Sequence, residues 1–142
     1  MPRILGVDYG ERRIGLAVSD PTATIARPLP TLLRRRGKRP PVAKVAELAR
    51  EHEADGIVLG LPLTPEGEED AWTREVRDFG EKLASRTGLP VEYIDERFTS
   101  ARAERAIRSL GLKRGAREEK GRVDAAAAVL ILQAYLDRQT HD

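Results

Sequence analysis

The chain has 142 residues, a formal net charge of +2 at pH 7 and no cysteine. This length fits one globular domain over residues 1–142, and the lack of cysteine excludes disulfides and thiolate metal sites. No apolar run approaches the roughly 18 residues of a membrane span and the N-terminus lacks a secretory layout, so we expect a cytoplasmic protein with no membrane partner.

The first part of the chain predicts three strands. Residues 3–9 and 12–18 are apolar runs separated by a short Gly-containing turn, which is typical of a hairpin. A third strand is expected within residues 27–33. Pro28 and Pro30 place that strand near an edge of the sheet, because proline has no N–H to donate to a strand ladder.

Helices and strands alternate through the rest of the chain. Apolar spacing and capping residues predict, in order, helix 41–53, strand 56–61, helix 72–88, strand 91–94, a helix capped by Thr99 or Ser100, and helix 123–138. The charged segments 34–39 and 112–122 are expected to be loops. Strand 56–61 lacks polar alternation and is expected in the middle of the sheet. This order predicts an α/β fold with a mixed five-stranded sheet flanked by helices, and a site at the carboxyl ends of its central strands.

Acidic residues stand where this arrangement brings elements together. Asp8 ends the first strand, Asp95 and Glu96 end the last strand, and Asp124 begins the final helix. Clustered carboxylates repel one another, and a divalent cation removes that repulsion. Oxygen ligands without His or Cys favour Mg²⁺ or Mn²⁺, and two such ions about 3.5–4 Å apart stabilise a phosphoryl displacement. The pattern indicates metal-dependent hydrolysis of a phosphodiester.

Each of these carboxylates also has a structural explanation. Asp8 fits a turn residue before Gly10, and Asp124 fits a helix N-cap. Asp95 and Glu96 are adjacent on a predicted strand, so their side chains point to opposite faces and only one is expected to face the site. The metal-site hypothesis therefore depends on the joint placement of the acids.

Basic residues form two clusters, at 34–39 and directly before Asp124, and three arginines flank the carboxylates. Most of the 25 basic residues are arginine, whose planar fork suits phosphate contact. The expected nucleic-acid contacts are Arg12, Arg13, Arg34, Arg35, Arg36, Lys38, Arg39, Arg97, Lys113, Arg114, Arg117, Lys120 and Arg122. Solvated loops, and salt bridges to Asp8 or Glu96, are the alternative roles of these cations.

Aromatic residues make up only 4% of the chain. Proteins that bind single strands by stacking use platforms of aromatic side chains. This composition predicts recognition of the nucleic-acid backbone by shape and charge rather than reading of bases.

Five ordered motifs resemble the YqgF/RuvX family of pre-16S rRNA nucleases and Holliday junction resolvase-like proteins. They are GVDYGERRIGLAVSD, RPLPTL, IVLGLPLTPEG, DERFTS and KGRVDAAAAVLILQAYL, and they span nearly the whole chain. The resemblance implies an RNase H-like fold. It also implies that Asp8, Glu96 of the DER motif and Asp124 are the catalytic carboxylates, which bind Mg²⁺ or Mn²⁺ and the scissile phosphate.

The same resemblance implies an endonuclease that acts on structured nucleic acid, first of all the pre-16S rRNA end in ribosome biogenesis. Cleavage of Holliday junctions, as a homodimer, is the alternative. Related bacterial junction resolvases carry their glutamate on the preceding strand, where this chain has Gly60-Leu61-Pro62 and no acid. This departure weighs against junction cleavage. A non-catalytic nucleic-acid-binding assembly factor stays open, whereas an actin-like phosphotransferase needs a second domain.

The basic clusters predict a salt-dependent affinity for nucleic acid. If about five of the cations contact phosphates, a plot of log affinity for B-DNA against log salt concentration has a slope of roughly −4 to −5, because bound cations displace counterions. Fluorescence anisotropy titrations of a labelled duplex at several salt concentrations measure this slope. An affinity that does not change with salt would contradict the prediction.

Overall fold

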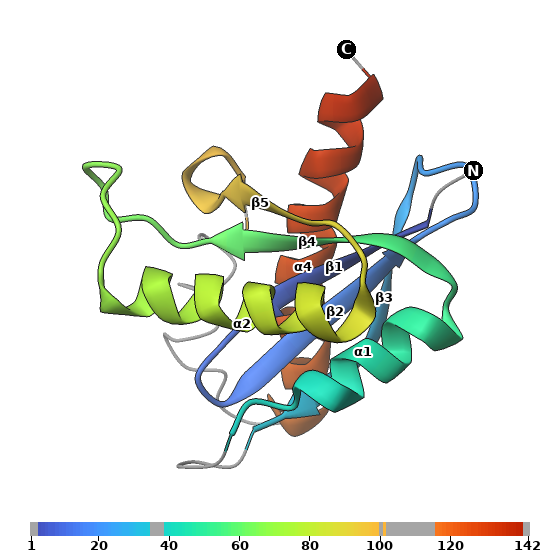
Figure 1. Ribbon diagram of the computed structural model, residues 1–142, viewed down its shortest axis with the longest axis horizontal. Coiled ribbons are helices and arrows are strands. Elements are labelled where there is room, and N and C mark those ends of the chain that lie inside the picture. The colour runs from blue at the N-terminus through green and yellow to red at the C-terminus, as the bar shows by residue number, and fades with distance from the viewer. Residues whose placement is uncertain (1–2, 35–38, 100, 102–115, 141–142) are drawn as a thin grey trace.

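A five-stranded sheet forms the centre of the computed structural model (Figure 1). The structure describes residues 3–34, 39–99, 101 and 116–140, with the backbone alone for 116–124 and 140. The strands are β1 (Arg3–Tyr9), β2 (Arg13–Ser19), β3 (Ala26–Leu33), β4 (Ala54–Leu61) and β5 (Val91–Asp95). The helices are α1 (Val42–Glu51), α2 (Ala71–Thr87), the short 3₁₀ helix η1 (Glu96–Phe98) and α4 (Ala116–Thr140). The helix expected after Ser100 lies outside the described residues.

The strand order is β3-β2-β1-β4-β5, and the sheet is mixed as the sequence predicts. β1 pairs antiparallel with β2, and β2 pairs antiparallel with β3. β4 pairs parallel with both β1 and β5. The proline-containing β3 is at an edge, and β4, whose residues 56–61 lack polar side chains, is inside the sheet. The carboxyl ends of β1, β4 and β5 therefore meet at one end of the sheet.

Helices cover both faces of this sheet, with α1 and α2 on one face and α4 on the other (Figure 1). Alternate residues of β1, such as Val7 and Tyr9, belong to one apolar cluster with Val45 of α1 and Phe79 of α2. A second cluster joins residues of the opposite face to α4. Because strand side chains alternate between faces, each strand contributes to both cores.

Helix α4 approaches β1 closely because β1 has a glycine at the crossing point. A Cβ atom at Gly6 would lie 2.7 Å from Cβ of Leu132 and 3.3 Å from the carbonyl oxygen of Ala128. Nothing larger than glycine fits there without movement of the helix. Gly6 thus determines how near the backbone of α4 lies to the α4-facing side of the sheet.

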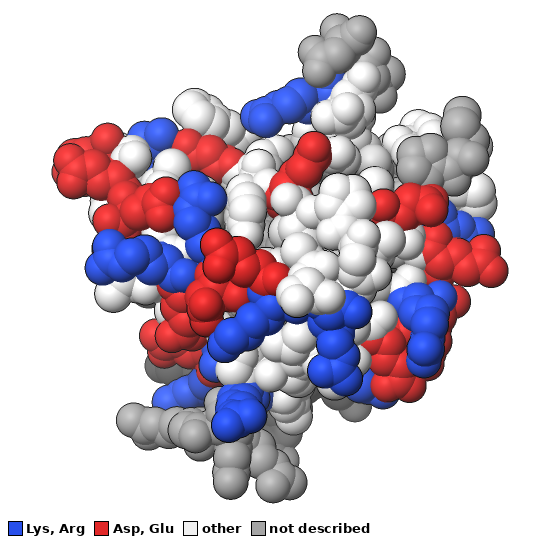
Figure 2. Space-filling view, viewed as in Figure 1, with Lys and Arg blue, Asp and Glu red and all other residues white. Residues whose placement is uncertain are grey.

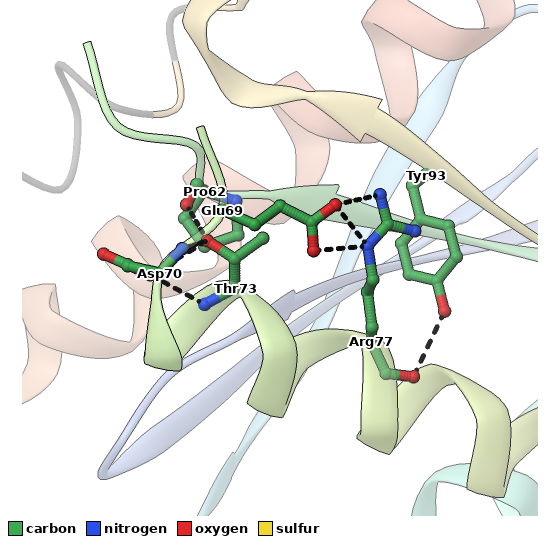
Figure 3. Close-up of polar contacts among 6 residues, drawn as sticks. All are labelled: Pro62, Glu69, Asp70, Thr73, Arg77 and Tyr93. Atoms are coloured by element: carbon green, nitrogen blue, oxygen red, sulfur yellow. Dashed lines mark hydrogen bonds and ion pairs between the residues drawn. The ribbon is translucent and has the colours of Figure 1, made fainter. Parts of the chain in front are cut away.

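Helix α2 begins in a network of side-chain hydrogen bonds at the end of the loop that follows β4 (Figure 3). Asp70 accepts a hydrogen bond from the backbone N–H of Thr73 at 2.9 Å, and the Thr73 hydroxyl donates to the Pro62 carbonyl at 2.7 Å. Glu69 pairs with Arg77 at 2.8 Å. The Tyr93 hydroxyl donates to the Arg77 carbonyl at 3.3 Å, which ties α2 to β5. These contacts fix the loop beside the carboxyl end of β4.

Helix α4 begins at Ala116, so the expectation that it begins near residue 123 was wrong. The segment before Asp124 is rich in Arg, Glu and Lys, which are strong helix formers, and the single Gly121 costs only about 1 kcal/mol. Asp124 therefore lies about two turns inside the helix. The N-cap role considered for Asp124 is excluded. Within the described chain, no helix combines the length and the apolarity that crossing a membrane requires.

The Gly6 contact generates a stability prediction. Gly6→Ala is expected to lower the free energy of unfolding by about 1–3 kcal/mol, because its Cβ overlaps the backbone-proximal atoms of α4 and the helix must shift. Gly56→Ala is the matched control, since its Cβ would meet the flexible Ile4 Cδ1 at 3.3 Å. Urea denaturation of both variants measures the difference. Equal stability of Gly6→Ala and the unmodified protein would show that α4 does not pack this closely.

Candidate active site

Asp8 is a buried carboxylate near the end of β1. It lies opposite Gly15 of β2 and is 3% exposed. Its neighbours Val7 and Tyr9 face α1 and α2, so alternation directs Asp8 to the α4 side of the sheet. The strand rather than a loop therefore holds this carboxylate in place, as the sequence predicts.

Glu96 is the second buried carboxylate, and it lies over β4. The residue is 1% exposed. A Cβ atom at Gly60 would lie 2.5 Å from Oε1 of Glu96 and 2.6 Å from Cδ1 of Ile131 in α4. The carboxylate thus fills the space in which a longer residue of β4 would place its own side chain. Sequence reasoning recorded that Gly60 is not acidic but missed this role. A glycine inside an apolar strand is a signal of close approach.

The strand register brings Asp8 and Glu96 together. Val7 of β1 pairs with Leu59 of β4, so Asp8 and Gly60 each come one residue later on adjacent strands. Both positions face α4, and neighbouring strands are about 4.8 Å apart. The carboxylate over Gly60 therefore stands beside Asp8 on one face of the sheet.

Asp95 has a different environment from Glu96. It forms an ion pair with Arg97 at 2.8 Å and accepts a hydrogen bond from the Arg97 backbone N–H at 2.9 Å. The strand ends at Asp95, and Glu96 is the first residue of η1 rather than the last residue of a strand as expected. The turn of η1, and not strand alternation, separates the two acids. Asp95 is the partner of Arg97 and Glu96 is the interior acid.

The backbone of Asp124 lies at the level of Asp8, although its side chain is outside the described side chains. The Ala128 carbonyl lies next to Gly6, and Gln133 accepts a hydrogen bond from the Ala26 N–H at 3.0 Å, near the opposite end of β1. Hence α4 runs antiparallel to β1, and residue 124 is one turn beyond Ala128 toward Asp8. Among the side chains that the structure describes, no three acidic or histidine residues lie close enough to hold a metal ion together.

Arg34 lies in a packed position beside the β1–β2 turn. Its side chain is only 11% exposed and pairs with Glu75 at 3.8 Å. Its Nη1 donates to the Gly10 carbonyl at 2.8 Å, and its guanidinium lies 4.7 Å from the centre of the Tyr9 ring. These contacts fix the turn that follows Asp8. Contact with nucleic acid by Arg34 stays a prediction, and it competes with this structural role.

Tyr9 supports the same turn and was not singled out by sequence reasoning. Its ring stacks on Trp72 and Phe79, with ring centroids 5.4 and 4.3 Å apart. Burial, assisted by the neighbouring Glu75 and opposed by Arg34, raises the pKa of Tyr9 to about 12. Tyr9 is thus a neutral phenol at physiological pH and donates a hydrogen bond to Glu75 at 3.1 Å. The only sequence signal was an aromatic residue at the end of an apolar strand.

The other predicted phosphate contacts have varied surroundings. Arg97 is held by Asp95, whereas Arg12 is exposed in the β1–β2 turn, Arg13 is half-buried and Arg39 is exposed. The remaining ones lie outside the described residues or side chains: Arg35, Arg36, Lys38, Lys113, Arg114, Arg117, Lys120 and Arg122. On the α1–α2 face, basic and acidic side chains are interspersed (Figure 2).

Comparisons with known proteins match this chain over nearly its full length. Residues 2–138 match the family described as "RuvX: Holliday junction resolvase". A protein of Anaeromyxobacter sp. (strain Fw109-5), named "Putative pre-16S rRNA nuclease", is 47% identical over 135 residues, which are 95% of this chain and 96% of that protein. A protein of Chloroflexus aurantiacus with the same name is 44% identical over 134 residues, which are 94% of this chain and 86% of that protein.

Solved structures of junction resolvases share the fold. Thermus thermophilus RuvC in complex with a Holliday junction substrate superposes with a TM-score of 0.58 at 18% identity, over 99% of this chain and 97% of that chain. Fowlpox virus resolvase, also in complex with junction DNA, gives a TM-score of 0.59 at 11% identity, over 96% and 98%. The expected RNase H-like fold is confirmed. The match over residues 2–138, together with relatives at 44–47% identity, establishes that the chain belongs to the RuvX family.

Proposed function

We propose that residues 1–142 form a single nuclease domain, a divalent-metal-dependent endonuclease that hydrolyses phosphodiester bonds in structured nucleic acid. The observation that carries the proposal is the buried Glu96 carboxylate, which lies over Gly60 and beside Asp8 at the carboxyl ends of three strands. The family match supports the same chemistry.

The two carboxylates fit a divalent cation. Asp8 and Glu96 are both almost fully buried, and ionised carboxylates are costly to bury unless a cation or hydrogen bonds compensate them. Their oxygens are the hard ligands that Mg²⁺ and Mn²⁺ prefer. We assign Asp124 as the third ligand, because its backbone lies one turn beyond Ala128 toward Asp8. Mg²⁺ or Mn²⁺ is therefore the proposed cofactor.

Each part of the chain has a distinct task in this mechanism. A divalent cation held by Asp8, Glu96 and Asp124 would supply Lewis-acid stabilisation of the charge that develops on the phosphoryl oxygens. Asp8 and Glu96 hold its position from rigid elements, which preorganises the site. Tyr9 and Arg34 fix the turn after Asp8, and Asp95 and Arg97 fix the turn that carries Glu96. Arg12 and Arg13 follow Asp8 by a few residues, and we propose that they contact the nucleic-acid backbone together with the basic clusters at 34–39 and 113–122.

The pre-16S rRNA end is the favoured substrate. Relatives at 44–47% identity carry the name "Putative pre-16S rRNA nuclease". Holliday junction cleavage is the second candidate, since two resolvases that share the fold were solved with junction DNA. In this chain the acid is Glu96 of η1, and Gly60 stands on the strand where related junction resolvases carry their glutamate. This difference favours the RNA substrate. A homodimer would accompany the junction activity.

The carboxylate assignment predicts which substitutions stop cleavage. Asp8→Asn and Glu96→Gln each remove a negative ligand oxygen without changing side-chain size. Each is expected to lower the cleavage rate at least about 100-fold, since a bound metal lowers the barrier by several kcal/mol. Denaturing gels with a pre-16S rRNA fragment, a single strand and a four-way junction, each with Mn²⁺ and with chelator, measure the rates.

Asp95→Asn is the matched control for these variants, because Asp95 is adjacent to Glu96 but pairs with Arg97. It is expected to keep cleavage within about tenfold while losing some stability. Undiminished cleavage by Asp8→Asn would refute the site. If Asp95→Asn lowered the cleavage rate as much as Glu96→Gln does, the role of catalytic carboxylate would pass to Asp95. Failure of the unmodified protein to cleave any substrate would favour the assembly-factor alternative.

The position of Glu96 over Gly60 predicts an effect on metal affinity. Gly60→Ala adds a Cβ that displaces the Glu96 carboxylate, and Mn²⁺ affinity is expected to fall about 10- to 100-fold, as for other changes in ligand support. Isothermal titration calorimetry measures the affinity, and circular dichroism checks that the variant is folded. Gly56→Ala, on the same strand but at the other end, is expected to keep the affinity. A folded Gly60→Ala with unchanged affinity would show that Glu96 is not a ligand.

A further inference from the structure

Phe98 is an exposed aromatic residue next to the candidate active site. Among the described residues, the exposed large hydrophobic side chains are Ile25, Leu33 and Phe98, and Phe98 is 72% exposed. Ile25 and Leu33 lie at the start and the end of β3, at the far edge of the sheet. Phe98 ends η1, which directly follows β5 at the opposite edge of the sheet. It is the only aromatic one of these three.

The short helix η1 joins Phe98 to the catalytic carboxylate. Glu96 and Phe98 are the first and last residues of η1, and at a rise of about 2 Å per residue they lie about 4 Å apart along its axis. Glu96 is inside and Phe98 is outside. The two residues are therefore close neighbours on opposite sides of one short turn. A substrate strand whose phosphate is held by a cation at Glu96 has a neighbouring base within reach of the Phe98 ring.

Hydrogen bonds hold η1 in one conformation. The Arg97 N–H donates to Asp95 at 2.9 Å, and the Thr99 N–H and hydroxyl both donate to the Glu96 carbonyl at 3.0 Å. The Arg97 guanidinium is fixed by Asp95 and lies 5.4 Å from the centre of the Phe98 ring. The backbone on both sides of the exposed ring is thus preorganised, so binding to the ring orders little else.

A groove of about 430 Å³ adjoins Phe98 and separates it from α4. Leu130 and Ala134 supply apolar lining, and Gln133 and Asp137 supply polar groups. This volume is within the range of small-molecule sites. The groove thus combines apolar walls, which suit the flat face of a nucleobase, with hydrogen-bonding groups that suit its polar edge.

We propose that Phe98 stacks on an unpaired base of the substrate strand beside the cleaved phosphate. The inference rests on the proposed nuclease function and deepens it, because it makes unstacked nucleotides the preferred substrate class. In a duplex the bases are already stacked and the ring gains no partner, whereas loops and single strands present free base faces. Base stacking, which the low aromatic content argued against, here needs only one ring and does not depend on base identity.

Binding measurements with single and double strands test this contact. In an Asp8→Asn background, which is expected to bind without cleaving, Phe98→Ala should weaken binding of a single strand of about 16 nucleotides by about 5- to 150-fold. Binding of the matching duplex should change less than about twofold. Phe98→Trp, which keeps an aromatic face, should retain single-strand affinity, and Phe98→Leu should not. A 2-aminopurine in the single strand reports stacking as fluorescence quenching.

The outcomes separate this inference from the function on which it rests. Equal effects of Phe98→Ala on single strand and duplex, or no effect on either, would overturn the stacking contact while cleavage by the unmodified protein would still support the nuclease. A selective loss of single-strand binding in a protein that cleaves nothing would support the contact and refute the nuclease. If Phe98→Ala instead converts a dimer into a monomer by sedimentation, without selective loss, the ring belongs to a protein interface and the proposal is wrong.

Discussion

The site depends on one steric constraint, the absence of a side chain at position 60. Oε1 of Glu96 occupies the space where a Cβ at Gly60 would lie, and Ile131 of α4 fills the rest. A glycine inside a strand weakens the strand, so Gly60 lowers the local stability of β4 while leaving room for the acid. In return the carboxylate comes from a short rigid turn and still reaches the strand adjacent to Asp8. The acid therefore comes from η1, whereas the space that it fills lies over Gly60 of β4.

Small residues also lie elsewhere between the sheet and α4. Gly6 brings the α4 backbone close to β1, and the facing residues of α4 include Ala127 and Ala128, which are fully buried. The opposite face uses large residues, among them Phe79 and Leu83 of α2. Small residues on one face and large ones on the other make α4 the nearer layer. This nearness sets the backbone of Asp124 level with Asp8.

The arginines predicted to contact nucleic acid divide into two groups by their contacts. Arg34 and Arg97 are fixed by protein acids and by aromatic rings, so they stabilise the turns that carry Asp8 and Glu96. Arg12 and Arg39 are exposed. Replacing a protein partner by a phosphate gains little net energy, whereas a solvated arginine loses less when it binds one. The exposed arginines are therefore the stronger candidates for contact with phosphate.

The sequence by itself determined the five strands, the edge position of β3, the helix that ends just before Gly88 and the position of Asp8 near the end of a strand, because these follow from local patterns of apolar residues, proline and glycine. Only the tertiary structure decided that Glu96 is inside while Asp95 pairs with Arg97, that Arg34 packs on Tyr9, and that α4 starts at Ala116. These features depend on contacts between residues far apart in the chain. The packing of α4 against Gly6 and Gly60 is the clearest case, since a glycine in the sequence shows that space is needed but not which atom fills it.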